Sequence, residues 1–184
     1  LLFKKAMEGA PDCGGLVSFN YYAGEPVTGL EEGRPMLLRL PDSDLSLANF
    51  MRAQLFASME TLKYGMEILS REKVAIDCVY GHGGLFKTEG VAQNLLAAAI
   101  HAPVTVMQTA GEGGAWGIAL LADYLLRRAP GESLEDYLDH KVFAGMAQKT
   151  VAPDARDEAG FDAYMDRFVS CIPAQKAAVQ ALKA

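Results

Sequence analysis

Residues 76–117 read IDCVYGHGGLFKTEGVAQNLLAAAIHAPVTVMQTAGEGGAWG and carry the clearest evidence for the fold class. It contains one pattern twice: a run of β-forming residues, a glycine-rich turn and an apolar helix. We expect a buried strand at 76–80 followed by a helix from 88 or 89 to 100, and then a strand at 103–107 followed by a helix at 115–128. Two consecutive strand–helix units predict a parallel strand pair with a right-handed crossover, and hence an α/β fold.

The sequence on either side adds further strands and helices. Residues 16–22 and 36–40 are rich in β-forming side chains and predict two more strands, separated by a long loop. Leucines and methionines at spacings of three and four predict one long helix over residues 47–69 with a single apolar face. We expect Ser133 to cap a short helix and residues 150–153 to be extended. We expect Asp154 to cap the last helix, and Pro173 to kink or split it. Five residues of this helix should share one apolar face: Phe161, Tyr164, Met165, Phe168 and Ile172.

Composition narrows the class of protein. The chain has 184 residues, of which 51% are hydrophobic and 22% charged, so it is a globular domain and not a disordered chain. Its net charge of −6 and the lack of a basic stripe argue against nucleic acid as a partner. No apolar run is long enough to predict a membrane span. Three widely spaced cysteines suit a reducing compartment, and we expect a cytoplasmic location.

The two glycine-rich turns, Gly81–Gly84 and Gly111–Gly114, are the candidate functional site. In an open parallel sheet, ligands bind at the carboxyl ends of the strands, where these turns are expected. Glycine permits close approach of the backbone to a ligand, and the start of the next helix offers free N–H groups to phosphate. The competing interpretation is that the glycines merely make tight strand-to-helix turns.

Common nucleotide-binding and hydrolase motifs do not fit. GxxxxGK[ST] is absent, which excludes a P-loop nucleotidase, and no GxSxG elbow indicates a hydrolase. Gly111, Gly113 and Gly117 come close to GxGxxG, but the spacing is one residue too long and no later strand supplies the acid that binds ribose. A small NAD(P)-binding domain is therefore a weak alternative.

Several motifs in order resemble a known family. Residues 83–88 (GGLFKT), then Gln93, then Pro103-Val104, then residues 112–122 (EGGAWGIALLA) resemble the C-terminal domain of the FGGY carbohydrate kinases. The resemblance extends over nearly the whole chain, and is strongest to the pentulose branch, the xylulokinases and L-ribulokinases. Because the chain also begins at Leu1 inside a predicted helix, we expect it to be a fragment of a longer protein.

The resemblance implies a fold and an activity. The fold would be the ribonuclease-H-like domain of the actin-like ATPases, a mixed sheet with flanking helices. Residues 1–184 would form a single nucleotide-binding domain with a helical tail from about residue 131, without the N-terminal sugar-binding domain of the same chain. The intact enzyme would use ATP and Mg²⁺ to phosphorylate a ketopentose. The implied nucleotide-binding residues are Gly83, Gly84, Lys87, Thr88, Gln93, Glu112 and Gly113.

The chain also departs from the family pattern. Leu85 stands where many members have a third glycine, and the family's D-x-G-T phosphate turn and catalytic Asp are absent. Phosphoryl transfer requires positioning, charge neutralisation and a base, so we expect the fragment to be inactive alone, with Mg²⁺ held mainly by the missing domain. The alternative function is a non-catalytic nucleotide- or ligand-binding module, and a homodimer is a further candidate assembly.

Ordinary structural roles compete with these assignments at several positions. Trp116 suits the core face of its predicted helix, and His82 between glycines is typical of a solvated turn. Lys87 lies at an expected helix start, where exposed lysines are common without any role in binding. Glu112 precedes a helix, where an acid favours the helix dipole.

Overall fold

The structure is a computed structural model that describes residues 1–182, with the side chain of Glu112 outside the description. The helices and strands in chain order are α1 (Leu2–Ala6), β1 (Val17–Phe19), β2 (Met36–Leu38), α2 (Leu47–Phe56), α3 (Glu60–Arg71), β3 (Val79–Gly81), α4 (Val91–Ile100), β4 (Val104–Met107), α5 (Gly113–Arg127), α6 (Leu134–Tyr137), β5 (Gln148–Val151) and α7 (Ala155–Ala181). Short 3₁₀ turns connect them, among them η3 (Gly84–Lys87) and η4 (Ala110–Glu112), and a π-helical turn, η5 (Leu138–Val142), follows α6. None of the helices in the described part of the chain is both long and apolar enough to cross a membrane.

The strands form two small sheets. β3 and β4 are parallel, with Val79 opposite Val104, and α4 connects them, which confirms the predicted parallel pair and the α/β class. β5 pairs antiparallel with β4, so the sheet is mixed. The sequence indicated only an extended stretch at 150–153, and the structure extends it into this third strand. β1 and β2 form a separate antiparallel pair.

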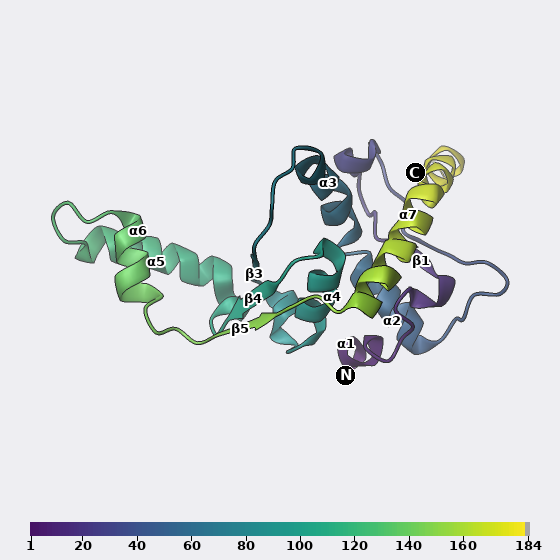
Figure 1. The fold of residues 1–184 in the computed structure, drawn as a ribbon. Coiled ribbons are helices and arrows are strands. Elements are labelled where there is room, and N and C mark those ends of the chain that lie inside the picture. The colour runs from purple at the N-terminus through teal and green to yellow at the C-terminus, as the bar shows by residue number, and fades with distance from the viewer. Residues whose placement is uncertain (183–184) are drawn as a thin grey trace.

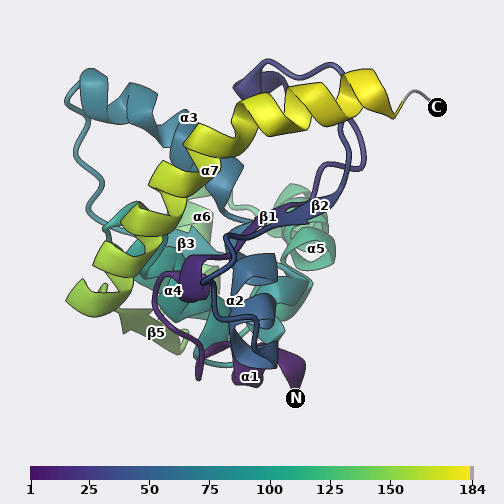
Figure 2. The same cartoon turned by 90° about the vertical axis from the view of Figure 1, so that its right-hand side faces the viewer.

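The core lies between α2, α4, α7 and β1, and α7 crosses over α4 and β1 (Figures 1 and 2). Aromatic rings fill it: Phe56 of α2 contacts Phe161 and Tyr164 of α7 at centroid distances of 4.7 and 5.2 Å. The expected buried face of the last helix is confirmed, and its members are Phe161, Tyr164, Met165, Phe168 and Ile172. Pro173 does not split this helix, which continues to Ala181.

The long helix predicted over 47–69 is wrong, because the structure has two helices there, with a break after Phe56. Beyond the break, α3 buries only Glu60, whose carboxylate accepts a hydrogen bond from the Tyr164 hydroxyl at 2.8 Å. Leu47 and Leu62, both expected on the buried face, are exposed. Apolar spacing shows which face of a helix is apolar but not where its axis turns. On either side of the break, Phe56 and Glu60 contact α7.

Two other burial expectations are also corrected. The strand at 76–80 is not buried: β3 is the edge of its sheet, and Tyr80 is 52% exposed. Trp116 is not in the core, since it is only half-buried and packs on Phe143 at a centroid distance of 5.8 Å. The reason is that α5 and α6 form an arm that extends away from the helices around the core (Figure 1).

Candidate functional site

The two glycine-rich turns lie against each other at one end of the mixed sheet. β3 ends at Gly81 and β4 at Met107, and because the strands are parallel, both chains leave the sheet at the same edge. The backbone N–H of Gly83 donates a hydrogen bond of 2.7 Å to the carbonyl oxygen of Ala110, which joins the first turn to the second. The structure therefore brings together two segments that the whole of α4 and β4 separates in sequence.

Two glycines of the second turn, Gly111 and Gly113, are closely packed. A Cβ atom on Gly111 would lie 3.1 Å from Cε of Lys87, and one on Gly113 would lie 3.0 Å from Cβ of His82. Side chains of the first turn thus rest on the backbone of the second, and a larger residue at Gly111 or Gly113 would have to displace them.

In the first turn, Gly81 is closely packed, since a Cβ atom there would lie 2.5 Å from the ring of Phe86, but Gly83 and Gly84 are not. Gly83 has φ 105°, a conformation that favours glycine, and a Cβ atom on Gly83 or Gly84 would meet no described atom within 4 Å. Nothing in the described chain fills the space beside them. Their backbone is therefore open to a ligand, and no neighbouring side chain explains the choice of glycine at Gly84.

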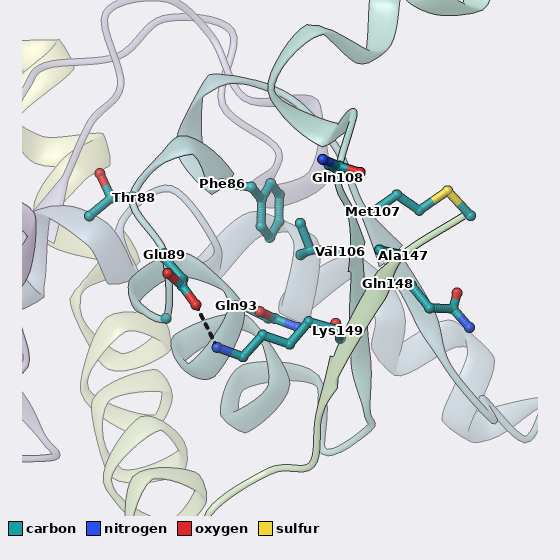
Figure 3. A pocket seen from close by; sticks show the side chains of 11 residues that line it. Phe86, Thr88, Glu89, Gln93, Val106, Met107, Gln108, Ala147, Gln148 and Lys149 are labelled. Carbon is teal, nitrogen blue, oxygen red and sulfur yellow. Dashed lines mark hydrogen bonds and ion pairs between the residues drawn. The ribbon is translucent and has the colours of Figure 1, made fainter. Parts of the chain in front are cut away.

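A cavity of about 470 Å³ opens beside the paired turns, between the start of α4 and the ends of β4 and β5 (Figure 3). Its volume is within the usual range for small-molecule sites. It is lined by Phe86, Thr88, Glu89, Gly90, Gln93, Val106, Met107, Gln108, Ala147, Gln148 and Lys149.

The predicted site residues divide into two groups. Thr88 and Gln93 line the cavity. Gly83, Gly84, Lys87 and Gly113 lie in the paired turns next to it and do not line it. Glu112 ends η4, and its side chain lies outside the described part of the structure.

Gln93 has a structural role that the sequence did not reveal. Its side chain is buried, and its amide nitrogen donates hydrogen bonds to the carbonyl oxygens of Val104 at 2.8 Å and Lys149 at 2.7 Å. Val104 belongs to β4 and Lys149 to β5, so this one amide joins both strands to α4. Gln93 thereby fixes the back wall of the cavity.

An ion pair lies at the side of the cavity. The ammonium group of Lys149 is 2.7 Å from a carboxylate oxygen of Glu89, and Figure 3 shows the two side chains meeting beside Gln93. The hydrogen bond from Lys149 and its charge lower the pKa of Glu89. Both groups are exposed to solvent. The pair therefore places charge beside the cavity but contributes little to the stability of the fold.

Sequence reasoning missed Glu89, Gln148 and Lys149 as cavity residues. Lys149 is separated from β4 by the whole α5–α6 arm, and only the antiparallel pairing of β5 with β4 brings it to the cavity. The sequence signal for β5 was the short extended stretch before Pro153. This stretch is too short to predict that it pairs with β4.

Among the side chains that the structure describes, which do not include that of Glu112, no group of three His, Cys, Asp or Glu is placed to hold a metal ion. All three cysteines are free thiols, and burial raises the pKa of Cys171 and, more strongly, that of Cys13.

Comparison with known proteins points to one family. Residues 1–126 match the model of the C-terminal domain of the FGGY family of carbohydrate kinases. Comparison with curated proteins found no match.

Solved structures share the fold. Xylulose kinase from Rhodospirillum rubrum is 19% identical, with a TM-score of 0.61 over 98% of this chain and 34% of its own. Gluconate kinase from Lactobacillus acidophilus is 15% identical, with a TM-score of 0.69 over 96% of this chain and 35% of its own. Plasmodium falciparum glycerol kinase with ADP is 13% identical, with a TM-score of 0.63 over 92% of this chain and 33% of its own. The chain thus spans about a third of the length of the solved structures that it matches.

Proposed function

The chain belongs to the FGGY family of carbohydrate kinases, and from that premise we propose that it forms the nucleotide-binding half of an ATP-dependent sugar kinase. The observation that supports this most is the pairing of the two glycine turns through Gly83 N–H and the Ala110 carbonyl at 2.7 Å. This pairing leaves an open glycine backbone next to a cavity at the carboxyl ends of parallel strands, where α/β folds bind ligands.

The residues of the turn fit a nucleotide. The backbone at Gly83 and Gly84 is free of side chains, so a ribose or phosphate can approach it closely. Lys87 brings a positive charge to the same turn, and Thr88 brings a hydroxyl group to the cavity. A cavity of about 470 Å³, walled by Phe86 and Val106, offers apolar faces to a base.

Mg²⁺ would be held mainly outside this chain. Phosphoryl transfer needs charge neutralisation by a metal and a residue that takes the proton of the acceptor hydroxyl. The described side chains, Glu112 not among them, offer no cluster of metal ligands, and the sequence has no D-x-G-T phosphate turn. We therefore infer that this chain binds and orients ATP, that an N-terminal sugar-binding domain of a longer, cytoplasmic enzyme completes the site, and that the chain alone does not turn over.

A ketopentose of the xylulose or ribulose type is our proposed acceptor. It is supported by the resemblance of residues 83–122 to the xylulokinases and L-ribulokinases. The solved structures, which include gluconate and glycerol kinases, are too distant in sequence to show more than the fold. A panel of xylulose, ribulose, gluconate and glycerol, offered to the full-length enzyme with ATP and Mg²⁺, tests this assignment, and preference for gluconate or glycerol would overturn it.

The nucleotide site is tested by NMR of the 184-residue chain titrated with ATP–Mg²⁺, with NADH as the control ligand. We expect ATP to shift the amide signals of residues 81–88 and 111–117. Gly83→Ala should weaken binding by about tenfold or more, roughly 1.4 kcal/mol, because alanine strains a backbone at φ 105° and adds a methyl group to the open face.

Gly29→Ala is the matched control. Gly29 also has positive φ, at 69°, and open space around its Cβ position, but it lies in a remote loop. Equal loss of ATP affinity in both variants, or no response of the two turns to ATP, would reject the nucleotide site.

A further inference from the structure

Gln93 presents one unsatisfied polar atom to the cavity beside the glycine turns. Its side chain lines that cavity and is only 4% exposed. Both protons of its amide nitrogen are used, because the nitrogen donates to the carbonyl oxygens of Val104 and Lys149. The amide oxygen accepts no hydrogen bond from any residue that the structure describes, and it is not sealed inside the protein. The cavity is therefore the route by which a hydrogen-bond donor can reach it.

The strands fix the direction in which this amide faces. If the amide of Gln93 were reversed, its oxygen would face two carbonyl oxygens and both hydrogen bonds would be lost. Figure 3 shows the oxygen on the side of Glu89 and the nitrogen on the side of β5. The cavity thus has an acceptor in its back wall that cannot turn into a donor.

The second buried glutamine of the described chain, Gln175, lacks this feature. Its oxygen accepts the backbone N–H of Arg34 at 3.3 Å, and its nitrogen donates to the carbonyl oxygen of the same residue at 2.7 Å. Gln175 therefore has partners for both ends of its amide within the chain. Of these two buried amides, only that of Gln93 leaves an acceptor for a ligand.

A second acceptor lies at the side of the same cavity. One carboxylate oxygen of Glu89 accepts the Lys149 ammonium group at 2.7 Å, and the other has no partner among the described residues. Because this bond lowers the pKa of Glu89, the carboxylate is ionised at neutral pH and can only accept. Phe86 and Val106 supply apolar walls. Apolar walls with two acceptors suit a flat ring that carries an amino group.

We propose that this cavity holds the nucleobase and that the Gln93 amide oxygen accepts a hydrogen bond from the amino group of the base. This rests on the proposed function, which supplies ATP, and names the residue that sets base specificity. The 6-amino group of adenine has two protons, one for Gln93 and one for the Glu89 carboxylate. Hypoxanthine, the base of ITP, has a carbonyl oxygen in that place and would set one acceptor against another.

The position of the cavity also lets the phosphates reach the first glycine turn. The 3₁₀ turn η3 has four residues and leads from Gly83 to the cavity residue Thr88. At about 2 Å per residue it spans roughly 8 Å. A nucleotide with its base against Gln93 can therefore extend its phosphates toward the open backbone of Gly83 and Gly84.

Nucleotide selectivity tests this assignment. The 184-residue chain is titrated by calorimetry with ATP, ITP and purine riboside triphosphate, each with Mg²⁺. We expect ITP to bind at least about tenfold more weakly than ATP. Purine riboside triphosphate, which has hydrogen in place of the amino group, should fall between them, because it loses the donor without adding an acceptor. The side-chain NH₂ signals of Gln93 should shift more with ATP than with ITP in NMR spectra.

Two variants separate base recognition from a purely structural role. Gln93→Met should bring the affinities for ATP and ITP to within about twofold of each other, whereas loss of a structural contact alone would weaken both equally. Because Gln93→Met also breaks the strand contacts, the exposed Glu89→Gln is the second variant. It should keep the melting temperature and lower the selectivity by about threefold. The exposed Gln180→Met is the matched control and should keep the selectivity of the wild type.

The possible failures point to different conclusions. Equal affinity of the wild type for ATP and ITP, with amide shifts still at residues 81–88, would overturn the role of Gln93 and leave the proposed function standing. Selectivity that survives in Gln93→Met would also overturn it, because another residue would then distinguish the bases. Absence of ATP binding would reject the nucleotide site and this role together.

Discussion

Glu60 is the most unusual single residue in the fold. Its side chain is fully buried at the start of α3, where one carboxylate oxygen accepts the Tyr164 hydroxyl hydrogen bond. The other oxygen has no hydrogen-bond partner among the described residues. Burial raises the pKa of Glu60 to about 9, so the folded protein holds it protonated at neutral pH.

Glu60→Gln should stabilise the protein and flatten its pH dependence. The unfolded chain releases the proton near pH 4.5 and the folded chain near pH 9, so the free energy of unfolding of the wild type falls as pH rises between these values. Glutamine cannot ionise, so at pH 8 the variant should be more stable by about 1–2 kcal/mol or more. Urea unfolding at pH 5 and pH 8 measures the difference.

Glu67→Gln is the control for this experiment, because Glu67 lies on the same helix with an exposed side chain. Its pH dependence should match that of the wild type. A Glu60→Gln variant with the same pH slope as the wild type would show that Glu60 is ionised in the fold.

At the scale of the elements, one buried amide connects β5 to helix α4. Gln93 of α4 donates to the carbonyl oxygens of Val104 and Lys149, and so connects α4 to both β4 and β5. Gln93→Met keeps a side chain of similar length but removes both hydrogen bonds and leaves two strand carbonyls without that donor. We expect a loss of roughly 2 kcal/mol in the free energy of unfolding.

Urea unfolding of Gln93→Met checks this expectation, and the exposed Gln180→Met, in α7, serves as its control. The loss should be accompanied by shifted amide signals along β5. Unchanged stability would mean that solvent satisfies the two carbonyls and that the amide nitrogen of Gln93 is also free to serve a ligand.

The residues that cap the starts of helices were the features best predicted from the sequence. The side chain of Asp154 accepts the backbone N–H groups of Arg156 and Asp157, which confirms it as the cap of α7. Ser133 caps α6 in the same way. A cap is a contact between neighbours in the chain, so the local sequence contains all of its information. The break between α2 and α3 could not be predicted from apolar spacing, and the residues beside it, Phe56 and Glu60, contact α7, at the other end of the sequence.

At the scale of the whole molecule, the α5–α6 arm and the core should differ in stability. The core helices α4 and α7 pack on each other, and α7 also packs on β1, whereas α5 has no buried residue in the part of the chain that the structure describes. Hydrogen exchange should therefore show protection factors in α5 at least about two orders of magnitude below those in α4. The two helices have similar composition, which makes α4 the internal control, and equal protection would show that the arm is covered in solution.

The α/β class, the parallel pair of β3 and β4, the glycine turns, the helix caps and the family could be predicted from the sequence, because each leaves a recognisable pattern along the chain. The aromatic face of α7 could likewise be predicted from helical spacing. The structure was needed to show that the two turns touch, that Lys149 and Gln93 complete the cavity wall, that α2 and α3 are separate, and that α5 lies uncovered. These features depend on contacts between distant segments, and the periodicity of a helix shows that it has an apolar face without showing what covers it.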